Sequence, residues 1–185
     1  SERMVELVQM VMTRADTPTA FGALPGPGAE INGDLLMVLV PLAWAERAKP
    51  APDDRYAAWA KRIVDAYVFE VMPNNAGLPS HEWDFTAHRG NAQTHLRDHG
   101  NEIIAGIVLY YCYLRGVDRT LAVRDYLPAV RTMIDRVLAS ANPDGLLYNR
   151  IDSRTLKPLT TNNSGRLADS WGYVYGAVYN FFLVT

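Results

Sequence analysis

Three aspartates occupy similar places in the chain, each near the start of an apolar stretch. They are Asp34, Asp98 and Asp169. A carboxylate at a helix N-terminus accepts hydrogen bonds from unpaired N–H groups and is stabilised by the helix macrodipole, so helix capping explains each one alone. The alternative is a ring of carboxylates at the mouth of a cavity, two of which flank a glycosidic bond. We favour Asp98 with Asp169 as that pair, because each follows a long connection rich in polar and aromatic residues.

Glycoside cleavage also needs a carboxyl group that keeps its proton near neutral pH. The macrodipole lowers the pKa of a carboxylate, so the three aspartates suit a base or nucleophile better than an acid. Glu82 and Asp84 lie between aromatic residues in the segment His81-Glu-Trp-Asp-Phe85. Apolar surroundings raise the pKa of a carboxyl group. We therefore predict that Glu82 or Asp84 supplies the acid.

All four histidines lie in the 19-residue segment from His81 to His99. His95 and His99 are four residues apart, which is metal-ligand spacing on a helix, but the chain has no HExxH motif. Hydrogen-bonded loop histidines are the simpler interpretation, and we predict no metal and no cofactor. His99, beside Asp98, is also a candidate base for a lyase that removes the proton next to a uronate carboxylate.

Aromatic and cationic side chains accompany these groups in the long connections. Aromatic rings stack on the apolar faces of sugars, although core packing explains many of them equally well. Arginines bind a uronate or sulfate in a bidentate manner, or simply solvate a loop. The predicted substrate-binding residues are Asp34, His81, Trp83, Arg89, Arg97, Tyr148, Arg166, Trp171 and Tyr173.

The apolar periodicity that positions these residues is helical throughout. The predicted helices cover residues 2–14, 32–48, 53–72, 96–115, 120–141 and from 167 onward. The first, third and fifth helices are amphipathic, and we expect Pro128 to kink the fifth. The other three are apolar almost all round and must be buried on every side. The pattern predicts outer and inner helices that alternate as helical hairpins.

Connection lengths alternate as well. The links at 49–52 and 116–119 are short, whereas those at 15–31, 73–95 and 142–166 are long. In stacked antiparallel hairpins all three long loops emerge on one face, and long loops in compact domains are usually functional. Residues 146–160 in the third loop have the pattern of a small β-hairpin.

This arrangement resembles the α/α toroids, a fold used by many glycoside hydrolases and polysaccharide lyases. The segment Gly165-Arg-Leu-Ala-Asp-Ser-Trp-Gly-Tyr-Val-Tyr-Gly-Ala-Val-Tyr179 is similar to their polar loops that run into an inner helix through a Trp-Gly pair. The resemblance extends over the whole chain, which would form three of the six helical hairpins of such a ring. It implies a carbohydrate-active enzyme. Toroids also serve other chemistries, so the fold alone does not decide the function.

Composition narrows the remaining classes. The 185 residues, 49% of them hydrophobic, suit one domain with a substantial core, covering 1–185. The formal charge of -2 argues against a global basic field for nucleic acid, and no apolar run is long enough to span a membrane. The single cysteine, Cys112, forms no internal disulfide. The chain ends within an apolar helical pattern, so we expect it to be a piece of a longer protein.

The function predicted from these features is glycoside hydrolysis of an oligosaccharide or polysaccharide. Two alternatives remain open: a non-catalytic helical-repeat domain that binds a glycan or a protein, and a lyase for anionic polysaccharides. The sequence predicts neither the sugar, the compartment nor the oligomeric state.

Overall fold

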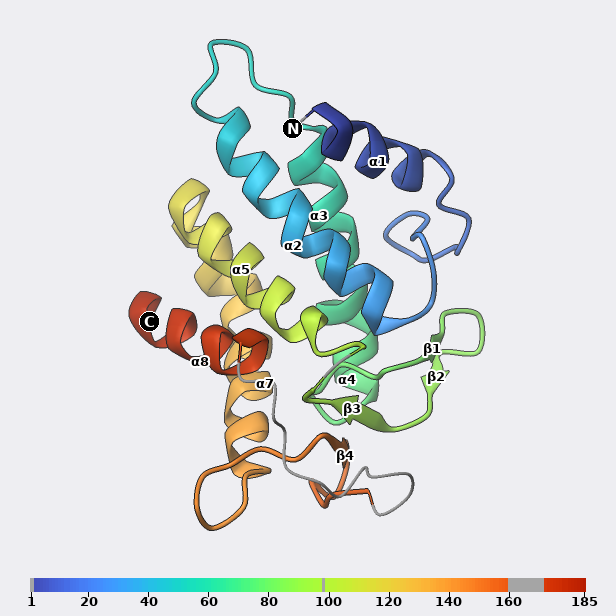
Figure 1. The fold of residues 1–185 in the computed structure, drawn as a ribbon, viewed down its shortest axis with the longest axis vertical. Coiled ribbons are helices and arrows are strands. Elements are labelled where there is room, and N and C mark those ends of the chain that lie inside the picture. Colours follow the sequence, from blue (N-terminus) through green and yellow to red (C-terminus); the bar gives the residue numbers. More distant parts are fainter. Residues whose placement is uncertain (1, 98, 160–171) are drawn as a thin grey trace.

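The computed structural model describes residues 2–97, 99–159 and 172–185, which form a mostly helical structure (Figure 1). Its longer helices are α1 (Glu2–Thr13), α2 (Ala29–Glu46), α3 (Arg55–Ala66), α5 (Glu102–Val117), α7 (Leu127–Ala139) and α8 (Gly172–Val184). Two short helices, α4 (Met72–Asn74) and α6 (Arg119–Leu121), and two π-helical turns, η1 (Tyr67–Val71) and η2 (Ala122–Tyr126), join them. The predicted all-α character is confirmed.

Both π-helical turns lie just before a proline. A proline inside a helix lacks an N–H and clashes with the carbonyl four residues earlier. For Pro73 and Pro128 those carbonyls belong to Phe69 and Arg124, which lie within η1 and η2. The wider π turn makes room for the proline ring, so the helical path continues. The kink predicted at Pro128 is therefore a π turn that precedes it.

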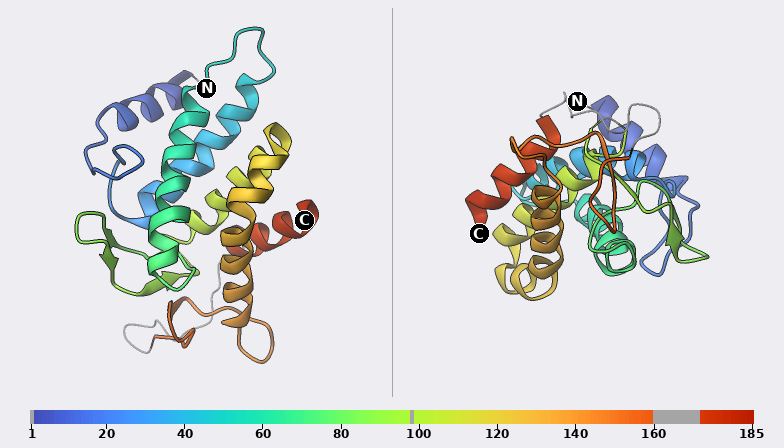
Figure 2. Two further views of the ribbon diagram at one scale, coloured as in Figure 1. Left: turned by 180° about the vertical axis from the view of Figure 1, so that it is seen from behind. Right: turned by 90° about the horizontal axis from the view of Figure 1, so that it is seen from below.

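Helix α5 lies at the centre of the molecule. It packs between α2 and α8, and α3 and α7 cover it from one side (Figure 2). From Glu102 to Tyr111 every residue except Leu109 is buried, whereas α3 exposes Arg55, Ala58 and Lys61. Helix α5, predicted to be inner, is thus more buried than the neighbouring α3, predicted to be outer, as expected for a helix without a polar face. The prediction that all three apolar helices are buried on every side is wrong for the other two, because Trp44 of α2 and Tyr179, Phe182 and Leu183 of α8 are exposed among the described residues.

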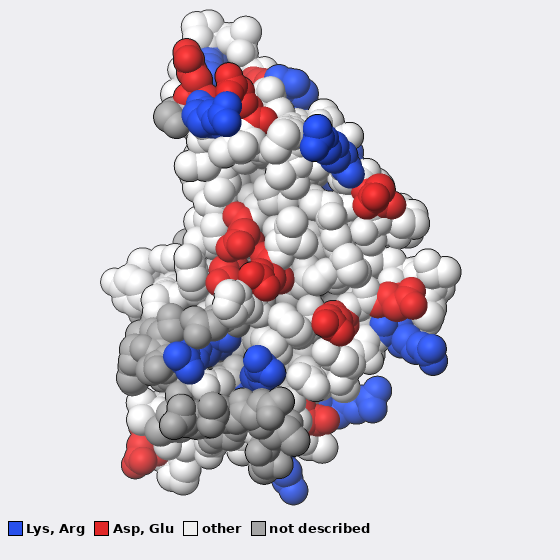
Figure 3. Space-filling model, turned by 45° about the vertical axis from the view of Figure 1, so that its right-hand side comes forward, with Lys and Arg blue, Asp and Glu red and all other residues white. Residues whose placement is uncertain are grey.

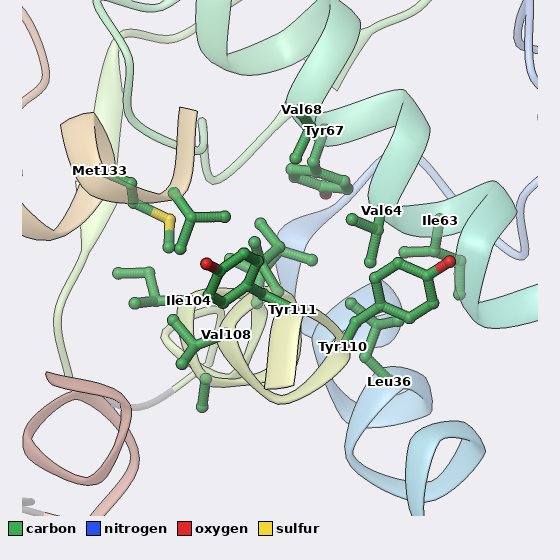
Figure 4. Packing of buried hydrophobic residues seen from close by; sticks show 14 of the residues in the cluster. Leu36, Ile63, Val64, Tyr67, Val68, Ile104, Val108, Tyr110, Tyr111 and Met133 are labelled. Carbon is green, nitrogen blue, oxygen red and sulfur yellow. The ribbon is translucent and has the colours of Figure 1, made fainter. Parts of the chain in front are cut away.

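The core fills the space between α5 and its neighbours. Leu36 of α2, Tyr67 of η1, Tyr111 of α5 and Met133 of α7 are fully or almost fully buried and belong to the same cluster (Figure 4). Burial raises the pKa of Tyr67 above its usual value. This core holds α2 and α5 against η1 and α7 and so positions the loops at their ends.

The three long connections meet at one end of the helices. Gly28, in the first, forms a β-bridge with Glu82, in the second. Strand β3 (Gln93–His95) of the second connection pairs antiparallel with β4 (Arg150–Asp152) of the third. The second also contains the two-stranded pair β1 (Trp83–Asp84) and β2 (Arg89–Gly90). The short α2–α3 link lies at the opposite end (Figure 1), so the predicted grouping of the long loops is confirmed.

Two sequence predictions need correction here. The helix expected from residue 96 begins at Glu102, because the Leu96 N–H donates to the Asn149 carbonyl, and His99 and Gly100 have positive φ angles that are incompatible with a helix. Around 146–160 the chain does turn back, with a β-bridge between Ile151 and Pro158. The main partner of β4, however, is β3, which lies more than fifty residues earlier in the chain.

Candidate functional site

Glycine allows α2 and α5 to approach each other very closely at their N-terminal ends. A Cβ atom on Gly33 would lie 2.3 Å from the Ile103 nitrogen, and one on Gly106 would lie 2.5 Å from Leu36 Cβ. Both distances are shorter than any real contact, so neither position accepts a larger residue without movement of the helices. The close approach places Asp34, the residue after Gly33, beside Glu102.

Acidic side chains gather near the middle of one face of the molecule (Figure 3). Glu30 and Asp34 are four residues apart on α2 and therefore share a helix face. Glu102 is the first residue of α5, and its Oε2 accepts a hydrogen bond from the Gly100 N–H (2.7 Å). We call Glu30, Asp34 and Glu102 the carboxylate cluster.

The pKa of Asp34 is raised above its usual value, chiefly by partial burial and then by the nearby charges of Glu102 and Glu30. Among the described residues, only His99 favours the charged form of Asp34. His99 Nδ1 lies 2.9 Å from Glu30 Oε1. The cluster therefore places a carboxyl group whose pKa is raised beside two further carboxyl groups.

Two histidines stack beside this cluster. The rings of His81 and His95 lie 3.5 Å apart and nearly parallel, at 11°. His95 Nδ1 is 3.0 Å from the carbonyl oxygen of His99. Burial lowers the pKa of both rings, and for His95 it falls to about 4, with His81 and Arg150 contributing. Both imidazoles are therefore neutral at pH 7 and stacked without charge repulsion.

Several fully buried polar atoms at this end of α2 and α5 have no hydrogen-bond partner among the described residues. Both amide atoms of Asn101 are of this kind, as is His95 Nε2. Asn101 is completely buried. Buried polar groups are normally paired with protein, water or a ligand. Buried amide and imidazole atoms near the carboxylate cluster are thus able to form further hydrogen bonds.

Two concavities adjoin the cluster. A groove of about 490 Å³ is lined by Glu30, Asp34 and the apolar side chains of Val11, Ile31, Leu35 and Val38. A larger pocket of about 730 Å³ lies between the first loop and β1–β2, with Glu82, Asp84 and Arg89 in its lining. Gly28 lines both. The cluster therefore opens onto an apolar groove, and the predicted acids line a neighbouring pocket.

The structure gives some of the predicted residues structural roles. Trp83 is only 2% exposed, and its indole N–H donates to Glu70 Oε1 (3.0 Å), so its ring serves the core. Asp84 Oδ1 accepts hydrogen bonds from the Thr86 and Ala87 N–H groups, which stabilise a turn and lower the pKa of Asp84. That direction is the opposite of what a general acid requires, so Asp84 does not suit the predicted acid role.

Other predicted residues are divided between this region and the surface. His81 and His99 lie at the cluster, Glu82 and Arg89 are exposed in the larger pocket, and Arg97 lies two residues after β3. Tyr148 is half-buried against the core, and Tyr173 is exposed on α8. The predicted pair Asp98 and Asp169, together with Arg166 and Trp171, lies outside the described residues.

Sequence reasoning missed Glu30, Glu102 and Asn101. The available signal was Gly33, a glycine near the start of an apolar helical pattern, where the lack of a side chain allows two backbones to approach closely. A second such glycine, Gly106, stands in the predicted partner helix. Together they indicate that the two helices touch near their starts, where carboxylates in each would be neighbours.

No protein-family model, curated protein or solved structure matches this chain. Within residues 2–97, 99–159 and 172–185, no three His, Cys, Asp or Glu side chains group in a way that could hold a metal ion. No helix in these ranges is long and apolar enough to cross a membrane. The site must therefore be interpreted from its own geometry.

Proposed function

We propose that the chain carries a glycoside-hydrolase site at the N-terminal ends of α2 and α5, in three hairpins of an α/α toroid. The observation that carries this is the juxtaposition of Asp34 and Glu102 across the glycine contact, with the pKa of Asp34 raised by its surroundings. Glycosidic cleavage needs one carboxyl group that donates a proton and a second one that acts as base or nucleophile.

In this proposal Asp34 is the general acid. Its proton passes to the glycosidic oxygen as the bond between that oxygen and the anomeric carbon breaks, and the leaving sugar departs as an alcohol. Glu102, whose Oε2 accepts a hydrogen bond from the Gly100 N–H, either attacks the anomeric carbon or takes a proton from an attacking water. Which of these occurs depends on the separation of the two carboxyl groups when substrate is bound.

The remaining groups support this chemistry. His99 holds Glu30, and the neutral stack of His81 and His95 lies beside the α5 start without adding positive charge. Asn101, which is completely buried, leaves two amide atoms for a bound water. The predicted pair Asp98 and Asp169 remains a competing proposal for the catalytic carboxylates.

The test is hydrolysis of a panel of neutral, amino-sugar and uronate oligosaccharides by the wild type and by Asp34→Asn and Glu102→Gln. We expect each variant to lose at least about 10²-fold in kcat/KM. The matched control is Asp135→Asn, which removes an exposed carboxylate from the outer helix α7. It should keep wild-type activity.

Binding of a glycan without turnover by the wild type would instead support the non-catalytic domain. Unsaturated products from uronate oligomers would support the lyase. The cluster of three carboxylates makes the lyase the weaker alternative, because a uronate beside it would be repelled.

A further inference from the structure

Gly28 is a glycine that the fold does not require. Its backbone has φ -86° and ψ 150°, an extended conformation that every residue adopts. Beyond its chain neighbours, a Cβ atom there would meet no atom closer than the His81 carbonyl oxygen, at 3.9 Å. Gly28 directly precedes α2, where serine, aspartate or asparagine would add a side-chain hydrogen bond that this helix start lacks. Conformation, packing and helix capping therefore leave the missing side chain unexplained.

The position of Gly28 gives its missing side chain a consequence. Gly28 lines the groove of about 490 Å³ that contains Asp34, and it also lines the pocket of about 730 Å³ between the first loop and β1–β2. The backbone here is fixed, because the buried Asn32 amide donates to the carbonyl oxygens of Gly26 and Gly28 (2.9 and 2.8 Å). A side chain at residue 28 would therefore stand where the two concavities adjoin, and glycine leaves that place free.

Both walls of the larger pocket are held in shape by contacts within the protein. On one side, β1 and β2 pair with each other, and the Trp83 indole N–H donates to Glu70 Oε1 (3.0 Å). On the first-loop side, Thr17 forms a β-bridge with Leu24. A pre-formed pocket lowers the ordering cost of binding, and a volume of this size is typical of pockets that bind small molecules.

The exposed lining of the larger pocket mixes hydrogen-bonding groups with apolar rings. Its exposed residues include Glu82, Thr86, Arg89, Asn91, Pro18 and Pro27. Sugar hydroxyls both donate and accept hydrogen bonds, so they match carboxylate, amide and guanidinium groups alike. The apolar C–H faces of sugar rings match the prolines here and the aliphatic side chains of the groove. Because acidic and basic groups line one pocket, a polymer charged on every unit meets a like charge there.

Resting on the proposed hydrolase function, we infer that the two concavities form one elongated cleft for a neutral, linear oligosaccharide whose chain passes over Gly28. Sugar units in the groove lie near Asp34, and the units beyond Gly28 occupy the larger pocket. A short oligosaccharide fills one concavity, whereas a longer one contacts both and buries more apolar surface. The substrate is therefore a stretch of a polysaccharide rather than a disaccharide.

Chain length and residue 28 together test the cleft. Calorimetry on the intact chain, in the cold where turnover is slow, compares β-linked trimers and hexamers of glucose, xylose and mannose with glucosamine and galacturonate hexamers. We expect at least one neutral hexamer to bind the wild type at least about tenfold more tightly than its trimer. Gly28→Phe should reduce that ratio to about twofold or less, because the ring stands in the path of the chain.

Two further variants separate this effect from stability. Gly28→Ala makes the same change at the start of α2 without the bulk, so it should melt at the temperature of Gly28→Phe and lose less of the hexamer preference. Gly176→Phe adds the same ring in α8, where nothing lies within 4 Å of the new Cβ, and should bind as the wild type does.

Equal affinities of trimers and hexamers for the wild type, or binding of no neutral hexamer, would overturn the inference. So would a hexamer preference that survives in folded Gly28→Phe, or a charged hexamer that binds more tightly than every neutral one. Chromatography of the same mixtures after warming separates the two proposals. Hydrolysis with equal kcat/KM for trimers and hexamers would overturn the cleft and leave the hydrolase standing. Hexamer-selective binding that depends on Gly28, without hydrolysis, would overturn the hydrolase and leave the cleft as a glycan-binding site.

Discussion

Gly33 of α2 packs against the backbone of Glu102 and Ile103, so closely that a Cβ atom would lie 2.6 Å from the Glu102 carbonyl carbon. This contact joins two helices whose starts are about seventy residues apart in the chain. It also determines that Asp34 and Glu102 are neighbours. The proposed chemistry depends on this one glycine contact between inner helices.

Gly33→Ala should therefore destabilise the fold by about 1–3 kcal/mol, because the added methyl group meets backbone that cannot rotate away. The same change should lower activity by separating the two carboxyl groups. Gly176→Ala in α8 is the matched control, since nothing lies within 4 Å of the added Cβ. That substitution should be neutral or stabilise the helix by up to about 1 kcal/mol. Chemical denaturation of both variants measures the difference, and equal stabilities would contradict the close approach.

Asp34→Asn should raise the melting temperature at pH 7 while it abolishes activity. The pKa of Asp34 is higher in the folded state than in the unfolded chain, so its contribution to stability is present at low pH and is lost as pH rises through the folded pKa. The asparagine amide does not ionise, so the variant avoids this loss of stability at pH 7. Its higher melting temperature should therefore disappear near pH 3, where the wild-type carboxyl group is protonated in both the folded and the unfolded state. Thermal melts across pH measure this, and a variant less stable than wild type at pH 7 would indicate a helix-stabilising role instead.

His95 should make the protein sensitive to acid. Its pKa is lowered to about 4 in the fold, so the unfolded chain takes up a proton first. Stability from this group is present above about pH 6.5 and is lost as pH falls toward 4, by about 3 kcal/mol in all. Urea denaturation of the wild type and of His95→Gln at several pH values tests this. The variant should show a flatter pH dependence, and an unchanged slope would exclude His95 as the source.

Trp83→Phe separates a core role from a sugar-stacking role. Loss of the indole N–H leaves the buried Glu70 without one of its donors, which should cost about 1–3 kcal/mol of stability. We expect kcat and KM of the folded variant to stay close to wild type. A rise in KM with unchanged stability would restore Trp83 to the substrate-binding set.

Much of the helical scaffold was predictable, because it is local. The contrast between an apolar helix such as α5 and an amphipathic one such as α3 is visible in spacing alone, and α5 is indeed the more buried. The pairing of β3 with β4 could not be predicted, because no feature of a single sequence identifies these two distant segments as partners. The start of α5 was misplaced for the same reason, because Leu96 is held by the backbone of Asn149.

The candidate site was predictable only in part. Carboxylates at the starts of apolar helices were predicted from the sequence, and one of them, Asp34, belongs to the carboxylate cluster. Its partner Glu102 was overlooked because an acidic residue in the first turn of a helix is common and needs no special explanation. Only the Gly33 contact makes it a neighbour of Asp34, and a contact between distant segments is a property of the folded chain.

The most direct measurement is an NMR titration of the Asp34 side-chain carboxyl carbon in the wild type and in Glu102→Gln, because it needs no substrate. We expect a pKa of Asp34 above the ordinary value near 3.9 in the wild type, and a lower one in Glu102→Gln, where one of the two repelling charges is gone. Asp135→Asn should leave the titration unchanged. An ordinary pKa in the wild type, or one that Glu102→Gln does not move, would contradict the claim that Asp34 and Glu102 form one functional pair.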